Sequence, residues 1–258
     1  MQKLDMELKD QYLHNMSIQE KVQKTIRKMN PGCLVTYENF KQLGEKYPNA
    51  LAKSLERLVE SGDLVRQKRG VYYKPQKSRF GQLNINENEI IRNLMYENSR
   101  LIGYPSGAEA FRKLGISTQV PNSITISTIK PRRKMKINNL NINFTKSKIN
   151  KIKKRDIIKL QILDTLKDIK KIQDSDINNA INKIYDWIDG LSIDEKKDMV
   201  RIAKKYTPQT RALLGAIIEV QDQYDLAEQL KKTLNPYTSF TLNISDNTLP
   251  NKKNWRIK

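Results

Sequence analysis

The sequence predicts an α+β fold that is predominantly helical, and three observations support this prediction. Three short helical patterns followed by two strand patterns occupy residues 17–76. Alternating apolar and polar residues within 77–155 indicate a small α/β region with a β-hairpin. From 156 to 236 the apolar residues recur at helical spacing, which predicts a C-terminal helical bundle. The polar ends are expected to form a flexible N-terminal tail, 1–16, and a loose C-terminal tail, 237–258.

The first two helices have clear start and stop signals. Ser17 and Glu20 form a Ser-x-x-Glu capping box, which marks the start of the first helix. Apolar residues then recur at helical spacing until Asn30-Pro31-Gly32 ends that helix. Thr36 is a suitable N-cap for a short second helix that Gly44 is expected to end.

A third helix and a β-hairpin complete this region. The helix is expected from Pro48 to about Ser61, because proline suits the first turn of a helix. Leu64 and Val65 start one strand, Val71 to Tyr73 form another, and Lys68-Arg69-Gly70 is the basic turn between them. Three short helices followed by a hairpin are the order of a winged helix-turn-helix domain, so residues 17–76 are predicted to be a DNA-binding domain.

The remaining elements alternate in type. After a linker at 76–82, residues 77–155 are expected to form a basic α+β domain, and we leave open whether the helices beyond pack with it as one domain. Its predicted elements are a helix over 87–98, a turn at Gly103–Gly107, a helix over Ala108–Leu114, a strand over Ile124–Ile129 and a hairpin over Met135–Phe144 around Asn138-Asn139. The helices that follow are expected at about 156–173, 176–189, 193–206, 208–220 and 222–234.

The charge is strongly positive and unevenly distributed. The chain of 258 residues carries a formal net charge of +20. Residues 1–79 hold 16 Lys and Arg against 9 Asp and Glu, residues 80–155 hold 15 against 4, and residues 156–258 hold 17 against 15. The excess therefore belongs to the first 155 residues. Basic proteins most often bind polyanions, and nucleic acid is the first candidate, with solubility alone as the alternative.

Few residues are suited to catalysis or metal binding. His14 is the single histidine and lies in the polar N-terminal tail, and Cys33 is the single cysteine. Asp174 and Asp176 flank Ser175 at a spacing that can hold a metal, but helix capping explains them better. The sequence also lacks phosphate-loop, dinucleotide-binding and nucleophile-elbow motifs. We therefore expect a protein that is not an enzyme and that holds neither a cofactor nor a metal.

No apolar run approaches the length of a membrane span. The longest one is Ala212 to Ile218, far short of about 18 residues. The first 16 residues are mixed in charge and lack the apolar core of a secretion signal. A cytoplasmic protein that does not enter the membrane is expected.

The third helix presents residues that suit the major groove. Its leucines fix the buried side, and at about 100° per residue Asn49, Lys53 and Arg57 point roughly the other way. Arginine pairs with guanine, asparagine with adenine, and lysine with guanine or phosphate. Glu56 and Glu60 would repel phosphates, and a solvated helix surface is the alternative. With the start of the second helix and the hairpin, the DNA-binding candidates are Thr36, Tyr37, Asn49, Lys53, Ser54, Arg57, Arg66, Lys68 and Arg69.

Two further basic clusters occupy residues 130–136 and 146–155. They can extend a DNA footprint, bind RNA, contact an acidic protein, or form a solvated lysine-rich face. The candidates in this second basic patch, for DNA binding or antitoxin function, are Lys130, Arg132, Arg133, Lys134, Lys136, Lys148 and Lys151.

Short segments within residues 17–150 match, in order and spacing, the pattern of a known family. The matching segments are Gly32–Phe40, Ala52–Val65, Arg69–Tyr73, Gly103–Ala110, Leu114–Pro121, Ile126–Thr128 and Arg132-Arg133. This pattern resembles the AbiEi-type antitoxins of type IV toxin–antitoxin systems. The helices beyond residue 155 depart from that pattern.

The resemblance implies a bacterial antitoxin from an abortive-infection system, a form of phage defence. In that family the winged helix binds operator DNA and represses its own operon, and the second domain neutralises a nucleotidyltransferase-type toxin without a stable complex. Carried over to this chain, the recognition helix falls on Pro48–Ser61 and the wing on Leu64–Tyr73. The expected partners are double-stranded operator repeats upstream of the operon and a cognate toxin.

A second hypothesis is a protein-interaction module that binds and inhibits a partner directly, with only nonspecific DNA binding. The near-neutral charge of residues 156–258 supports it, since the cores of protein interfaces are poor in charge.

Overall fold

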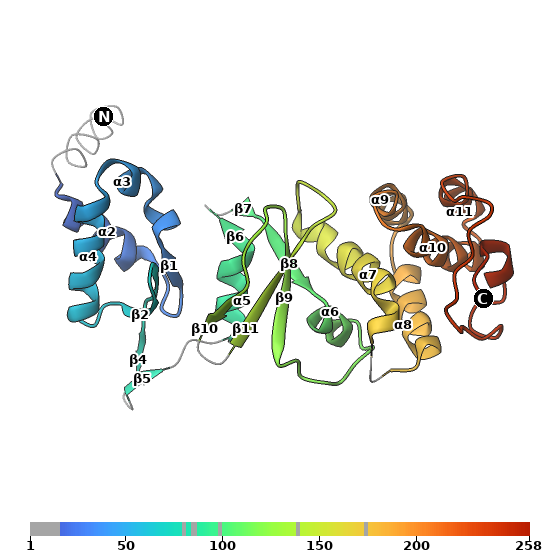
Figure 1. Ribbon diagram of the computed structural model, residues 1–258, viewed down its shortest axis with the longest axis horizontal. Helices are drawn as coiled ribbons and strands as arrows, with labels where there is room; N and C mark the ends of the chain where they lie inside the picture. The colour runs from blue at the N-terminus through green and yellow to red at the C-terminus, as the bar shows by residue number, and fades with distance from the viewer. Residues whose placement is uncertain (1–15, 79–80, 84–86, 98–99, 138–139, 173–174) are drawn as a thin grey trace. The chain divides into compact units, whose positions relative to one another are not determined.

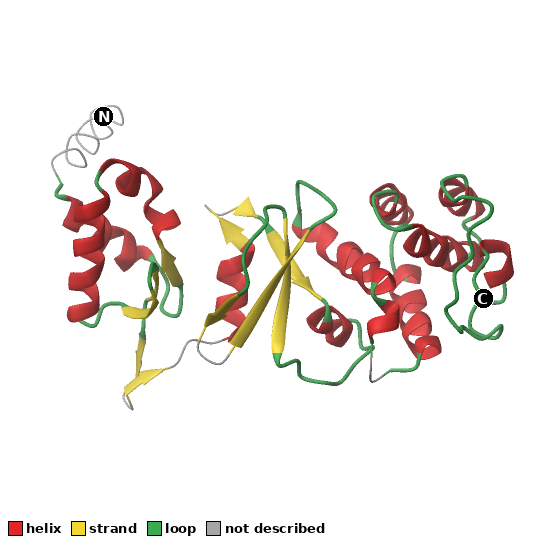
Figure 2. Ribbon diagram, viewed as in Figure 1, coloured by secondary structure: helices red, strands yellow, loops and turns green. Residues whose placement is uncertain are grey.

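The computed structural model describes residues 16–78, 81–83, 87–97, 100–137, 140–172 and 175–258 (Figure 1). The chain has an α+β fold that is predominantly helical, as predicted (Figure 2). It divides into two compact units, unit 1 (Met1–Leu94) and unit 2 (Met95–Lys258). This division falls later in the chain than the expected boundary at residue 76. Several predicted features lie outside the described residues: the tail as far as residue 15, His14, Asn138-Asn139 and Asp174.

Unit 1 contains a winged helix-turn-helix. A three-stranded antiparallel sheet, in the order β1-β3-β2, packs with the helices. The elements are α2 (Ile18–Lys28), β1 (Leu34–Thr36), η1 (Tyr37–Phe40), α3 (Lys41–Lys46), α4 (Pro48–Glu60), β2 (Val65–Lys68) and β3 (Val71–Tyr73). The strand β1 was not predicted, because three residues are too few to show an alternating pattern.

Local signals in the sequence determine how these elements begin and end. The Ser17 hydroxyl accepts from the Glu20 N–H at 3.2 Å, and the Glu20 carboxylate accepts from the Ser17 N–H at 2.8 Å, which confirms the capping box. Gly62 follows α4 with a φ of 73°, and Gly70 turns between β2 and β3 with a φ of 77°. The core of this unit joins α2, α4 and the sheet, and it contains Val22, Ile26, Val35, Phe40, Leu51, Leu55, Leu58, Leu64 and Tyr72.

The chain between the winged helix and unit 2 contains more structure than the expected linker. Strands β4 (Gln76–Ser78) and β5 (Gly81–Leu83) pair as an antiparallel hairpin. The helix α5 (Glu87–Met95) follows, and it is shorter than predicted because β6 (Tyr96–Glu97) takes over the next residues.

Unit 2 is built on a four-stranded sheet in the order β10-β11-β9-β8. β9 and β11 run parallel, and the other neighbours are antiparallel. β8 replaces the expected turn at Gly103–Gly107, while β9, β10 and β11 confirm the predicted strand and hairpin. The strands are β7 (Arg100–Leu101), which pairs with β6, and β8 (Gly103–Ser106), β9 (Ser123–Thr128), β10 (Met135–Ile137) and β11 (Leu140–Lys146).

The helices of unit 2 share one hydrophobic core with this sheet, as the core cluster runs from Leu101 in β7 to Ile257 near the C-terminus. α7 is buried along most of its length and lies between the sheet and the helices α9 and α10 (Figure 1). The helices are α6 (Ala108–Lys113), η2 (Lys154–Asp156), α7 (Ile157–Lys167), η3 (Ile169–Lys171), α8 (Ile177–Asp189), α9 (Ile193–Ala203), α10 (Pro208–Val220), α11 (Tyr224–Lys231) and η4 (Lys252–Trp255).

The prediction of a loose tail at 237–258 is wrong. Trp255 in η4 is 1% exposed, and its indole N–H donates to the Glu219 carboxylate at 2.9 Å. Backbone hydrogen bonds between Phe240 and Lys258 close the segment on itself. Phe240, Leu242 and Ile244 alternate with polar residues, and Leu242 and Ile244 are buried. This alternation is the signal that the sequence analysis missed, because the segment as a whole has the polar, Asn- and Thr-rich composition of a tail.

A buried carboxyl group connects three parts of unit 2. Asp164 in α7 accepts hydrogen bonds from the hydroxyls of Tyr104 at 2.9 Å, Ser106 at 2.7 Å and Tyr206 at 2.9 Å. Burial, reinforced by the Asp164 carboxylate, raises the pKa of both tyrosines above its ordinary value of 10.0. The network therefore positions β8, α7 and the segment after α9 relative to one another.

Candidate nucleic-acid interface

The exposed side of α4 is the centre of the predicted DNA-binding surface. Leu51 and Leu55 are fully buried, and Asn49, Lys53 and Arg57 are exposed, as the helical spacing predicts. Asn49 lies in the first turn of α4 and Lys53 lies one turn further along. These two side chains therefore share the N-terminal half of the helix, the half that enters the major groove in helix-turn-helix proteins.

Ser54 does not belong to this surface, contrary to prediction. It is 5% exposed, and its hydroxyl donates to the carbonyl of Ala50 at 2.8 Å. On a helix, position 54 falls on the same side as Leu51 and Leu58, so the hydroxyl lies over the buried face and bonds to its own helix.

Arg57 is exposed but is held toward α2. Its guanidinium donates to the Gln19 side-chain oxygen at 2.5 Å. Glu56 and Glu60 are also exposed on α4, so their negative charge remains on the surface as expected. Asn49 and Lys53 are consequently better placed than Arg57 for contact with a base.

The N-terminus of α4 adds positive charge that the sequence analysis missed. Lys46 and Tyr47 precede Pro48 and are exposed, and the Lys46 ammonium lies 5.9 Å from the centre of the Tyr47 ring. Tyr47 supplies no side-chain cap to the helix. The partial positive charge of a helix N-terminus favours anions. A basic residue two positions before a helix that starts with proline is the signal that would have identified Lys46.

The start of the second helix packs against the wing. The Asn39 side-chain oxygen accepts from the Thr36 N–H at 2.7 Å and from the Thr36 hydroxyl at 3.2 Å, at the start of η1. The Tyr37 ring lies over the turn of the wing, so closely that a Cβ added at Gly70 would lie 3.1 Å from the ring. Burial raises the pKa of Tyr72 in β3, and its neighbour Tyr37 contributes to this shift. Tyr37 therefore packs against the turn of the wing with one part of its side chain, while 41% of the residue remains exposed to solvent.

The wing carries two described basic side chains on its surface. Arg66 and Arg69 are exposed, and Arg66 lies opposite Tyr72 in the ladder of β2 and β3. The register shifts between Arg66 and Lys68, where β2 has an extra residue. The backbone of Lys68 lies in β2, and its side chain is outside the described part of the structure.

The second basic patch is in unit 2, and its members differ in their surroundings. Lys130 forms an ion pair with Glu97 at 3.2 Å, and the Arg132 guanidinium lies 5.9 Å from the centre of the Phe144 ring. The other candidates are exposed: Arg133, Lys134, Lys136, Lys148 and Lys151. Lys130 therefore contributes less free charge than the sequence suggests.

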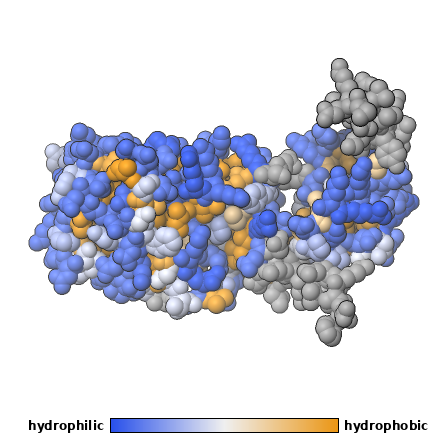
Figure 3. Space-filling view, turned by 180° about the vertical axis from the view of Figure 1, so that it is seen from behind, coloured by the Kyte–Doolittle hydropathy of each residue, from blue (hydrophilic) through white to orange (hydrophobic). Residues whose placement is uncertain are grey.

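The parallel strands bring the two basic segments of unit 2 to one edge of the sheet. Lys146, at the end of β11, is paired with Thr128, at the end of β9. The chain after each strand therefore leaves from the same edge, and the Ser147 N–H donates to the Thr128 carbonyl at 2.9 Å. The surface view shows hydrophilic side chains over most of the visible face of each unit, with smaller hydrophobic areas on unit 2 (Figure 3).

Comparison with known proteins identifies the family. The model of a family of unknown function, DUF6088, matches residues 21–195. The chain belongs to the DUF6088 family. The match covers the winged helix, the sheet of unit 2 and its helices as far as the start of α9.

Other comparisons add little to this DUF6088 chain. A crystal structure of the RV2827C protein from Mycobacterium tuberculosis is similar with a TM-score of 0.47 and 10% identity, over 85% of this chain and 82% of that chain. No curated protein matches the sequence.

In this DUF6088 member, the described residues contain no group of three or more metal-binding side chains. The carboxylate of Asp176 accepts from the Asn179 N–H and caps α8, which confirms the capping interpretation. Cys33 is half-buried and free. Among the described helices, none is both long and apolar enough to cross a membrane.

Proposed function

We propose that this protein is a bacterial antitoxin of a type IV toxin–antitoxin system that acts in the cytoplasm. Its winged helix binds operator DNA and represses its own operon, and unit 2 neutralises a nucleotidyltransferase-type toxin. The proposal assigns no catalytic step, cofactor or metal to the chain. Its partners are the operator repeats and the cognate toxin.

One observation carries the DNA-binding part of the proposal. In a winged helix-turn-helix, α4 exposes Asn49 and Lys53 on its N-terminal half, and the wing exposes Arg66 and Arg69. Asparagine and lysine on the recognition helix suit base edges, while arginines on a wing suit the phosphate backbone. The antitoxin part is supported by the resemblance of residues 17–150 to AbiEi-type antitoxins. All but the first four of these residues lie within the region 21–195 that the family model matches.

The test is a fluorescence-anisotropy titration with the DNA upstream of the protein's own gene and with a scrambled duplex, at two salt concentrations. We expect a preference of at least about a hundredfold for the upstream DNA; specific DNA-binding proteins typically reach about 10³- to 10⁷-fold. Lys53→Ala is expected to weaken that complex by about 1–3 kcal/mol and the scrambled complex much less. Lys28→Ala, which removes an exposed charge from α2 instead, is the control.

Equal and steeply salt-dependent binding to both duplexes would contradict a sequence-specific repressor. In that case the second candidate gains support, in which the protein binds and inhibits a partner directly. Two exposed aromatic residues favour it: Tyr224 is 62% exposed and Tyr237 is 94% exposed. Co-purification with the toxin encoded next to this gene would support direct inhibition, and separation on a sizing column at micromolar concentration would count against it.

A further inference from the structure

The segment Lys146–Arg155, which we call the basic strap, connects the sheet of unit 2 to α7. Six of its ten residues are lysine or arginine. From residue 130 to residue 155 the chain contains eleven basic residues and no aspartate or glutamate. Such a run is usually a loose and solvated loop.

Buried residues fix the strap to the body of unit 2. Ser147, Ile149 and Ile152 are 5%, 8% and 6% exposed, and both isoleucines belong to the hydrophobic core. The Ser147 N–H bonds to β9, and at the other end the Lys153 N–H donates to the Asp156 carboxylate at 3.2 Å. The strap is thus held at both ends by hydrogen bonds and in its middle by the buried side chains of Ile149 and Ile152.

The lysines between these anchors point to solvent. Lys148, Lys151 and Lys153 alternate with the buried residues and are all exposed. Their positions are fixed by the anchored backbone, so a partner does not need to order the segment, and binding loses less entropy than it would with a flexible loop.

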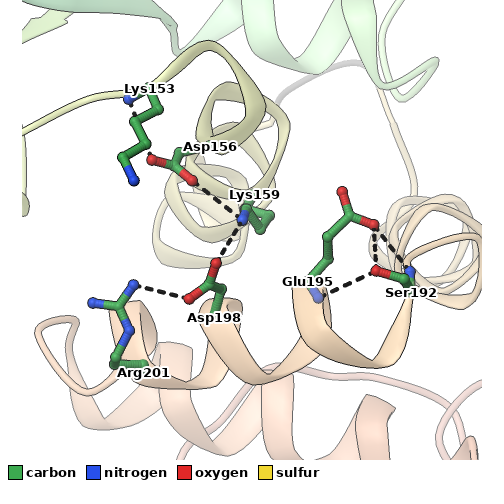
Figure 4. Close-up of polar contacts among 7 residues, drawn as sticks. All are labelled: Lys153, Asp156, Lys159, Ser192, Glu195, Asp198 and Arg201. Carbon is green, nitrogen blue, oxygen red and sulfur yellow. Dashed lines mark hydrogen bonds and ion pairs between the residues drawn. The ribbon is translucent and has the colours of Figure 1, made fainter.

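Asp156, which follows the strap, and Asp198 both pair with other cations. The Asp156 carboxylate lies 3.2 Å from the Lys159 ammonium, which is fully buried, and the Asp198 carboxylate lies 3.5 Å from the same ammonium (Figure 4). The other oxygen of Asp198 pairs with Arg201 at 3.0 Å. Both carboxylates are therefore used inside unit 2.

One basic residue of the strap is a weaker member. Glu195 caps α9, because its carboxylate accepts from the Ser192 N–H at 3.0 Å (Figure 4). That hydrogen bond lowers the pKa of Glu195, and Arg155 adds a smaller contribution. The charge of Arg155 is thus partly balanced, and we assign the contact with a partner to the three lysines 148, 151 and 153.

We propose that the basic strap binds the phosphate backbone of duplex DNA without regard to sequence. Duplex DNA as the partner rests on the proposed function. Lysines that contact phosphates supply affinity and salt dependence, while base preference comes from other contacts. The strap would therefore strengthen binding to whatever DNA the winged helix selects.

The composition of the strap favours a duplex over the other polyanions. Between Thr145 and Asp156 there is no aromatic residue on which the bases of a single strand stack. The strap also exposes no large apolar side chain, since Ile149 and Ile152 are buried, and so it lacks the apolar core of a protein interface.

The test compares two triple variants of the full chain that lose the same charge. The strap variant is Lys148→Gln, Lys151→Gln and Lys153→Gln. The control is Lys183→Gln, Lys204→Gln and Lys205→Gln, which are exposed lysines of α8 and of the segment after α9. Affinity for the upstream DNA duplex, for an arbitrary DNA duplex and for an RNA duplex, all of equal length, is measured from 50 to 200 mM salt. Thermal unfolding first shows that both variants are folded.

We expect the strap variant to lower the slope of log affinity against log salt by about 2.7, if each lysine contacts one phosphate. The wild type then loses roughly 40-fold more affinity than the variant across this range. Both DNA duplexes are affected alike, so the preference between them is unchanged. The control variant keeps the wild-type slope.

Three results would overturn the proposal. They are an unchanged slope in the strap variant, an equal decrease in the control variant, and a loss confined to duplex RNA of the same length. Failure of the proposed function gives a different result, since the wild type would then show no preference for the upstream duplex while the strap variant still lowered the slope on both.

Discussion

Trp255 occupies the space beside Gly215 that a side chain at position 215 would need. A Cβ built on Gly215 would lie 2.1 Å from Cη2 of the indole. The ring is buried, and its N–H donates to the carboxylate of Glu219, which lies in α10 together with Gly215. The glycine therefore permits the C-terminal segment to pack against α10.

Gly215→Ala is expected to destabilise unit 2 by about 1–3 kcal/mol through overpacking, despite the higher helix propensity of alanine. Urea-induced unfolding measures the change. Gly190→Ala is the control, because a Cβ there would lie no closer than 3.7 Å to any neighbour. Equal stabilities of the two variants would contradict the close packing of Trp255.

Asp164→Ala is expected to cost more than about 3 kcal/mol, since it leaves three buried hydroxyls without their acceptor. Asp164→Asn retains an acceptor and is expected to cost less. Thermal unfolding of both variants provides the measurement. Equal and small effects would mean that the hydroxyls find other partners.

High pH is expected to weaken the same network. The pKa of Tyr104 and of Tyr206 is raised by burial, so both stay neutral in the folded chain when an unfolded tyrosine ionises near 10.0. The stability that the two tyrosines contribute is fully present below pH 10. Above pH 10 the free energy of unfolding falls by about 1.4 kcal/mol per pH unit for each tyrosine. Unfolding followed at pH 9 to 11 measures the decline.

Tyr206→Phe should give a shallower decline than the wild type over this range, because one of the two groups no longer titrates. A variant at the exposed Tyr237, Tyr237→Phe, should follow the wild-type curve.

Ser54→Ala is expected to leave operator preference unchanged, because its hydroxyl bonds to Ala50 within α4 rather than facing solvent. Asn49→Ala, on the exposed side of the same helix, is expected to reduce the preference by about 1–3 kcal/mol. Anisotropy titrations with matched and scrambled duplexes separate the two. Loss of preference in Ser54→Ala alone would show that the helix binds DNA through another side.

Local signals explain why the sequence predicts unit 1 well. The capping box at Ser17, the proline at position 48 and the left-handed glycine at position 62 each define a helix end without reference to distant residues. The same periodicity places Asn49 and Lys53 outward. It also places Ser54 on the inward side of the helix with Leu51 and Leu58, so the periodicity itself contradicts the prediction that Ser54 contacts DNA.

Non-local contacts explain what the sequence does not predict. The pairing of β9 with β11 joins strands that are separated by a hairpin strand, and no short pattern encodes it. The ion pair of Lys130 with Glu97 spans 33 residues. Trp255 and its neighbours are buried by helices far away in the sequence, so their segment has the polar composition of a tail.

The wide sequence separation of contacts in unit 2 has a consequence for the order in which the protein folds during synthesis. The winged-helix core extends only from Val22 to Tyr72, whereas Tyr104 and Tyr206 meet Asp164 across 60 and 42 residues, and Trp255 completes the same core. Local contacts form sooner than distant ones. The winged helix can therefore fold on the ribosome early in synthesis. The core of unit 2 can be completed only after Trp255 has been synthesised.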